Sequence, residues 1–267
     1  MRRLWYLICC ALITLPLQAA ASKLIYNAKP DSLALQLVTK VSELNCDCVI
    51  AIGKTGLNEA LTMPQKSPIF VIDISAATFN EFKETFPKRK LVAIFSEPDP
   101  KALVTLGSII FNKNRLALFY SERTSFVKKH VQDIHVMKTD KSRIRKELSK
   151  LSRIDAVIAI PDANIWNKQT FRTAVNSLYR QGKALIGFNQ SLAKAGAIAA
   201  LYTNESTIIS QLDTMINDYV LSGKLPSSAY PDTYNLEINT QIARTLNIPL
   251  LSKEEIMKAL NKELLDE

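Results

Sequence analysis

The run DAVIAIPD at residues 155–162 is the most informative stretch for the fold class. Positions 156–160 are all apolar, and a proline and an aspartate follow them directly. A short continuous apolar run that ends in a turn is typical of a strand buried on both faces, because a half-exposed strand alternates apolar and polar positions. Similar runs occur at residues 24–26, 48–52, 69–72, 91–95, 116–120 and 184–188.

Segments of helical length separate these runs. Residues 32–44 place Leu33, Leu37 and Val41 on one stripe at helical spacing. Comparable segments lie at residues 79–86, 102–111, 142–151, 165–181 and 206–221. Buried strands that alternate with helices predict an α/β protein with doubly wound parallel sheets, covered on both faces.

Length and composition fit two such units. The chain has 267 residues, of which 47% are apolar, with only 7 Gly and 11 Pro, so a disordered or collagen-like chain is excluded. We predict an N-terminal α/β lobe at residues 22–111, a C-terminal α/β lobe at 112–230, and a closing strand and helices at 231–267. The polar stretch at residues 112–115 is interpreted as the hinge between the lobes.

The first residues indicate export. Arg2 and Arg3 precede an apolar run at residues 4–17, and three alanines at 19–21 supply the small residues of a cleavage site. The run is shorter than the roughly 20 apolar residues that a membrane span needs. We therefore predict a signal peptide at residues 1–21, with an uncleaved anchor as the alternative.

Cleavage there would leave Cys46 and Cys48 as the only cysteines. Residues two apart in an extended strand point to opposite faces, so a bridge between them would require a strained turn. We favour a buried strand residue at Cys48 and a loop thiol at Cys46 over a redox or metal site. The two histidines lack a partner at metal-binding spacing, so no metal is predicted.

The charge balance is basic, with 34 Lys plus Arg against 25 Asp plus Glu. The basic residues between 128 and 153 spread over more than one predicted element and are not interleaved with aromatic residues, which argues against nucleic-acid binding. A solvated surface is the plainest interpretation, and attraction of an anionic solute or an acidic membrane surface is the alternative.

The tripeptide Gly53-Lys54-Thr55 looks like the end of a phosphate-binding loop. That loop needs another glycine five residues earlier, and position 48 is a cysteine. We therefore predict neither nucleotide hydrolysis nor a cofactor. No Gly-x-Ser-x-Gly turn is present either, and neither histidine lies at a predicted strand end, so we assign no catalytic residues and predict that the protein is not an enzyme. An exported α/β enzyme is the alternative.

Polar and aromatic side chains follow the predicted strands at their carboxyl ends, where open parallel sheets bind ligands. The candidate ligand-binding residues are Thr55, Asp73, Ser75, Tyr120, Asp162, Phe188 and Asn189. For the two aspartates and Thr55, helix capping is the alternative role. The two aromatic residues could equally be core or wall residues.

A family resemblance rests on the run at 155–162, on Gly187-Phe188-Asn189, on residues 194–202, and on the tail at 234–239 and 243–248. These segments resemble the uncharacterised ABC transporter substrate-binding family. The likeness is good from about residue 155 to 250 and only general before that, where the N-terminal half is shorter than usual and Lys54 stands where a smaller residue is usual.

The resemblance implies a type I periplasmic-binding fold whose two lobes close on a small solute and deliver it to the permease subunits of an ABC transporter. It implies a periplasmic location, and it carries over Thr55, Asp73, Tyr120, Asp162 and Phe188 as ligand contacts. An amino acid is one candidate solute, because the family includes binders of aromatic amino acids. We expect a monomer. The alternative is a ligand-sensing or interaction protein of the cell envelope with no transport role.

Overall fold

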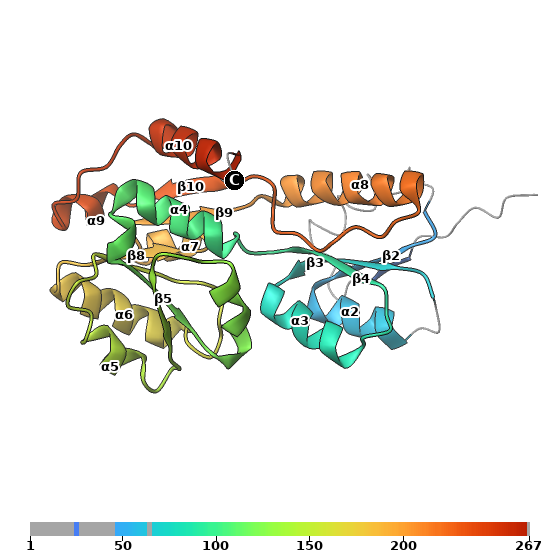
Figure 1. Ribbon diagram of the computed structural model, residues 1–267, viewed down its shortest axis with the longest axis horizontal. Helices are drawn as coiled ribbons and strands as arrows, with labels where there is room; N and C mark the ends of the chain where they lie inside the picture. The colour runs from blue at the N-terminus through green and yellow to red at the C-terminus, as the bar shows by residue number, and fades with distance from the viewer. Residues whose placement is uncertain (1–23, 27–45, 63–65, 266–267) are drawn as a thin grey trace, which may run out of the picture.

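The computed structural model describes residues 24–26, 46–62 and 66–265 and shows two lobes, each built on its own sheet (Figure 1). The first sheet is entirely parallel, and its strands lie side by side in chain order. They are β1 (Leu24–Tyr26), β2 (Val49–Ile52), β3 (Ile69–Ile74) and β4 (Leu91–Phe95). All residues of β2 and β4 are buried, as their continuous apolar sequences predict.

Helices cover both faces of this sheet. Helices α2 (Gly53–Thr62) and α3 (Ala76–Thr85) pack on one face, where Leu57 and Phe79 join the strand residues of the core. The long helix α8 (Glu205–Ser222) packs on the other face through Ile209 and Leu212. Figure 1 shows α8 lying along the first sheet, opposite α2 and α3.

The second sheet has six strands in the order β10-β9-β8-β7-β5-β6, and only β10 is antiparallel to its neighbour. The strands are β5 (Leu116–Tyr120), β6 (His135–Lys138), β7 (Ala156–Ile158), β8 (Ala184–Gly187), β9 (Ala199–Tyr202) and β10 (Asn235–Ile238). The chain runs outward from β5 to β6 and then returns to β7 on the other side. This order is doubly wound and places the topological switch point between β5 and β7.

Helices also cover both faces of the second sheet. One face carries α4 (Pro100–Ile110), the 3₁₀ helix η2 (Glu122–Lys129) and α10 (Lys253–Leu265). The other carries α5 (Ile144–Leu148) and α6 (Lys168–Arg180). The remaining short elements are η1 (Lys113–Arg115), α7 (Gln190–Lys194) and α9 (Thr240–Thr245).

These observations confirm the α/β class with parallel sheets. However, two helices pack on the lobe opposite to the one that the expected boundaries at residues 111 and 230 assign them to. Helix α4 packs on the second sheet and α8 on the first. The chain therefore first crosses between the lobes at residues 96–99, rather than at 112–115, and it crosses again before and after α8. Helical periodicity reveals that a helix has an apolar face, but it does not reveal which sheet that face covers.

The predicted apolar runs included neither β6 nor β9. Strand β6 lies at the edge of the sheet, paired only with β5, and none of its four residues is fully buried. An edge strand of this kind carries no continuous apolar run. The predicted signal peptide at 1–21 and the predicted helix at 32–44 lie outside the described residues. Across residues 46–62 and 66–265, none of the helices combines the length and the apolar character of a membrane span.

The prediction for the two cysteines was wrong. The structure joins Cys46 and Cys48 by a disulfide, with 5.3 Å between their Cα atoms, and both residues are buried. The prediction assumed an extended strand at these positions. However, β2 begins only at Val49, and the chain bends at Asp47. The bend lets both side chains point to the same side.

Candidate functional site

The two lobes meet where α3 of the first lobe faces η2 of the second (Figure 1). Helix α3 begins after Ser75, whose hydroxyl oxygen accepts a hydrogen bond from the Thr78 backbone N–H at 3.2 Å. Helix η2 begins after Ser121, whose backbone N–H donates to the Thr124 hydroxyl at 3.0 Å. Both helices follow the carboxyl end of a parallel strand, so they lie at the sheet edge where such folds bind ligands.

Arg123 connects the lobes at this place. Its Nε donates to Glu81 Oε1 at 2.6 Å, and its Nη2 donates to the Thr78 hydroxyl at 2.7 Å. The Arg123 side chain is 25% exposed and that of Glu81 is 52% exposed. An ion pair that is this accessible to water contributes little to stability, about 1 kcal/mol or less. It can therefore open and close without a large energetic cost.

A cavity of about 390 Å³ lies between α3 and η2. Its size falls within the range of roughly 300–1,000 Å³ that is typical of small-molecule sites. Glu81 and Glu84 line it from α3, and Glu122 and Arg123 line it from η2. Lys83 of α3 lines the same space, so the lining carries carboxylates and cations from both lobes. Such a lining suits a solute that carries groups of both charges.

Aromatic side chains lie on the inner side of this contact. Phe126, which lines the cavity, also packs against the cores of both lobes. The Tyr230 ring lies 4.9 Å from the ring of Phe95, centroid to centroid, in an edge-to-face arrangement. Burial raises the pKa of the Tyr230 hydroxyl well above its usual range, so this group stays neutral near pH 7.

Glu97 is a buried carboxylic acid behind α3, and only 6% of it is exposed. Its Oε1 accepts a hydrogen bond from the Ala76 backbone N–H at 2.7 Å, and the Ser96 hydroxyl donates to its Oε2 at 3.3 Å. Burial raises the pKa of Glu97 from 4.5 to about 7, although these hydrogen bonds oppose the shift. Near neutral pH, the protonated and the ionised forms of Glu97 are therefore both populated. Ala77, which follows the Ala76 that binds Glu97, lines the cavity.

Asp162 joins two loops at the switch point between β5 and β7. It is 3% exposed, and its carboxylate accepts hydrogen bonds from the backbone N–H groups of Ser121 at 3.0 Å and Asn164 at 2.9 Å. It also accepts one from the Thr124 hydroxyl. The N-cap of the next helix, α6, is Asn167. Asp162 thus fastens the start of η2 to the loop after β7, and it does not line the cavity.

The three candidates of the first lobe take different positions. Thr55 is exposed in the first turn of α2, and Asp73 is exposed with a φ of 53° beside Gly53. A positive φ at a residue other than glycine is uncommon and strains the backbone. Ser75 caps α3 and also donates to the Thr78 hydroxyl at 2.9 Å, the same hydroxyl that Arg123 reaches. Ser75 therefore belongs to the network between the lobes.

The remaining candidates of the second lobe have identifiable packing or capping roles. The Nζ atom of Lys128 lies 5.4 Å from the centre of the half-buried Tyr120 ring, a cation–π distance. Phe188 packs against the cores on both faces of the second sheet. Asn189 caps α7, because its Oδ1 accepts from the Leu192 backbone N–H at 3.0 Å.

Sequence patterns missed Arg123, Glu81 and Phe126. All three lie inside helices, where a charged or aromatic residue is ordinary, and nothing in their spacing distinguishes them. Glu97 had a visible signal, since it is a carboxylate directly after a wholly apolar strand and one polar residue. Among the side chains that the structure describes, no group of three His, Cys, Asp or Glu residues is placed to hold a metal ion.

Two lobes built on parallel sheets, with a cavity between helices that follow their strands, form a type I periplasmic-binding fold. Known structures support this class. The chain is similar to the ABC domain in complex with L-Trp from Streptococcus pneumonia, with 17% identity over 85% of this chain and 81% of that one and a TM-score of 0.52. No protein-family model matches the sequence. A sequence comparison with curated proteins also gives no match.

Two further structures share the fold. One is the ligand-free, open structure of a substrate binding protein with adhesive properties from Clostridium difficile, with 14% identity over 78% of this chain and 76% of that one and a TM-score of 0.56. The other is a conserved domain protein from Vibrio cholerae, with 15% identity, coverage of 83% and 79%, and a TM-score of 0.52. At such identities the likeness shows the fold and not the ligand.

Proposed function

We propose that the protein is a periplasmic solute-binding protein that captures a small molecule between its lobes and delivers it to an ABC permease. The observation that carries the proposal is the cavity between α3 and η2, which has charged side chains from both lobes and an ion pair across it. The fold it shares with a domain solved in complex with L-Trp and with a substrate binding protein supports it.

Binding of this kind needs no bond chemistry. A solute that contacts both lobes favours the closed arrangement by its higher affinity for that state. Glu81 is already bound to Arg123, so a solute with an ammonium group would compete for the Glu81 carboxylate, and its own carboxylate would pair with Arg123. The pair therefore offers one partner for each charge of a zwitterion, and we infer that an amino acid is the leading solute class.

Four of the predicted contacts remain part of this proposal. Thr55, Asp73, Ser75 and Tyr120 have side chains that are at least partly exposed beyond the strand ends. In the solute-bound form we expect them to face the solute. Asp162 is assigned a supporting role, because its carboxylate already accepts three hydrogen bonds from the two loops at the switch point.

A thermal-shift screen against amino acids, nucleosides and inorganic anions tests the proposal. A solute at about 100 times its dissociation constant adds about 2.7 kcal/mol to stability and raises the melting temperature. Asn80→Trp, which fills part of the cavity, should abolish the shift. Asn261→Trp on the exposed side of α10 should retain it. If no compound class shifts the wild-type protein, or if both variants respond like the wild type, the proposal fails.

A further inference from the structure

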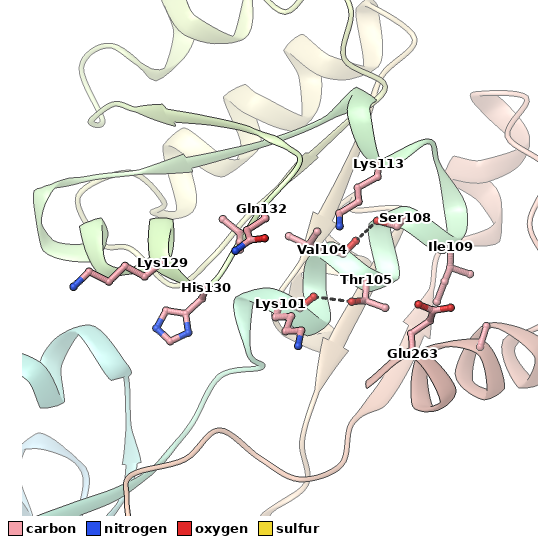
Figure 2. Close-up of a pocket in the computed structure, with 12 residues that line it drawn as sticks. Lys101, Val104, Thr105, Ser108, Ile109, Lys113, Lys129, His130, Gln132 and Glu263 are labelled. Carbon is pink, nitrogen blue, oxygen red and sulfur yellow. Dashed lines mark hydrogen bonds between the residues drawn. The ribbon is translucent and has the colours of Figure 1, made fainter. Parts of the chain in front are cut away.

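A second and larger cavity, of about 590 Å³, lies on the flank of the second lobe. Helix α4 lines it, and residues 129–132 at the end of η2 and the C-terminal part of α10 also border it (Figure 2). None of its lining residues lines the cavity between the lobes. A ligand bound here would therefore occupy a site separate from that of the captured solute.

Lysine side chains border this cavity. Lys101, Lys113 and Lys129 line it together with His130, and Glu263 is the carboxylate among the lining residues. Two carboxylates that do not line the cavity, those of Asp133 and Asp99, also interact with its cationic side chains. Asp133 lies 3.3 Å from Lys113 in an exposed pair, and the charge of Lys101 acts on Asp99. Lys101 and Lys113 lie on either side of the α4 residues of the cavity, whereas the Lys129 side chain points away from them (Figure 2). An anion bound between Lys101 and Lys113 would be attracted by both ammonium groups.

The α4 side of the cavity offers hydrogen-bond acceptors next to these cations. Thr105 Oγ1 donates to the Lys101 carbonyl at 3.0 Å, and Ser108 Oγ donates to the Val104 carbonyl at 2.9 Å (Figure 2). Because each hydroxyl proton is used inside the helix, each oxygen presents lone pairs to the cavity. Such oxygens suit a ligand that brings hydroxyl donors of its own. The buried Val104 and Val131 add an apolar part to the lining.

We propose that this cavity binds a phosphate group that carries neighbouring hydroxyl groups, as in a phosphorylated polyol. Lys101 and Lys113 hold the phosphate, and Thr105 and Ser108 accept hydrogen bonds from the hydroxyl groups. Such a ligand has two sources, a soluble polyol phosphate or the headgroup of a glycerophospholipid. The site is independent of solute capture between the lobes, so either proposal can fail without the other.

Calorimetric titration of the purified chain with glycerol 3-phosphate tests the site. The double variant Lys101→Gln/Lys113→Gln should bind at least tenfold more weakly. The matched control Lys88→Gln/Lys224→Gln removes the same charge from exposed lysines outside this cavity and should bind like the wild type. Absence of wild-type binding to both glycerol 3-phosphate and phosphatidylglycerol vesicles, or an equal loss in both double variants, overturns the proposal.

A second pair of titrations tests the role of the hydroxyl oxygens. Thr105→Val/Ser108→Ala keeps the charge and should weaken glycerol 3-phosphate binding severalfold while leaving inorganic phosphate binding unchanged. An equal effect on both ligands contradicts the assignment to polyol phosphates. Co-sedimentation with phosphatidylglycerol vesicles that is lost in Lys101→Gln/Lys113→Gln identifies the lipid as the source, whereas glycerol 3-phosphate binding without co-sedimentation identifies the soluble compound.

Discussion

Glu97 shows how one buried side chain links pH to the region where the lobes meet. The folded protein buries this carboxyl group away from water, so it holds its proton up to a pH of about 7, whereas the unfolded chain releases it near 4.5. Between these values the folded state binds more protons than the unfolded state. The stability contribution of Glu97 is therefore complete below pH 4.5 and is lost as the pH rises through 7.

We predict that Glu97→Gln removes this pH dependence. Glutamine keeps an oxygen that accepts the Ala76 N–H and carries no charge at any pH. Relative to the variant, the wild-type protein should lose about 3 kcal/mol of unfolding free energy between pH 4.5 and pH 8. Urea unfolding at several pH values measures the difference. Two curves that run parallel over this range would show that Glu97 titrates as an exposed carboxyl group does.

The disulfide gives a second prediction for single residues. Because Cys46 and Cys48 are joined, alkylation of the purified protein in denaturant without reductant should leave both unmodified. After reduction, mass spectrometry of the peptide that contains them should show two added groups. Alkylation of either cysteine before reduction would contradict the bridge.

At the scale of elements, α4 lies unusually close to the second sheet. A Cβ atom at Gly107 would lie 2.9 Å from Leu116 Cδ1 and 3.2 Å from Ile186 Cδ1. Alanine favours a helix by about 1 kcal/mol over glycine, but overpacking a core costs about 1–3 kcal/mol. The balance favours glycine, which explains why this residue interrupts the apolar face of the helix.

We therefore predict that Gly107→Ala lowers the unfolding free energy by about 1 kcal/mol. The neighbouring Ser108→Ala, which faces the flank cavity, should stay within about 0.5 kcal/mol of the wild type. Denaturant midpoints of the three proteins provide the test. A Gly107→Ala protein more stable than the wild type would mean that α4 lies farther from the sheet than the structure shows.

The contact between α3 and η2 can be tested separately. Arg123→Ala removes the ion pair to Glu81 and the hydrogen bond to Thr78, so we expect the lobes to separate more often. Small-angle scattering should give a larger radius of gyration for this variant, with stability reduced by about 1 kcal/mol at most. The control Arg145→Ala, at an exposed position of the second lobe, should scatter like the wild type. An unchanged radius in Arg123→Ala would show that other contacts hold the lobes together.

The elements also show how far the sequence can predict this protein. Apolar runs correctly predicted most of the buried strands, because a strand covered on both faces has a local signature. The site depends on contacts that are distant in sequence. Arg123 and Glu81 are 42 residues apart, and Ser121 and Asp162 are 41 apart. Local sequence patterns contain no information about such pairs. The sequence therefore predicted candidate residues at strand ends but not the residues that form hydrogen bonds with them.

At the scale of the whole molecule, the three segments that cross between the lobes explain how two sheets can share one cavity. They are the connections before α4, before α8 and after α8. Each of them joins an element of one lobe to an element of the other. Because α8 and α4 each cover the sheet of the other half of the chain, neither lobe is formed by one continuous segment. The lobes are thus tied together while the cavity between α3 and η2 stays open to a solute.

Hydrogen exchange measured by mass spectrometry, with and without a solute identified in the thermal-shift screen, tests this account most directly. If the solute lies between the lobes, peptides that cover α3 and peptides that cover η2 should both exchange more slowly when it is bound. Protection confined to one lobe, or protection elsewhere with both of these helices unchanged, would contradict capture between the lobes.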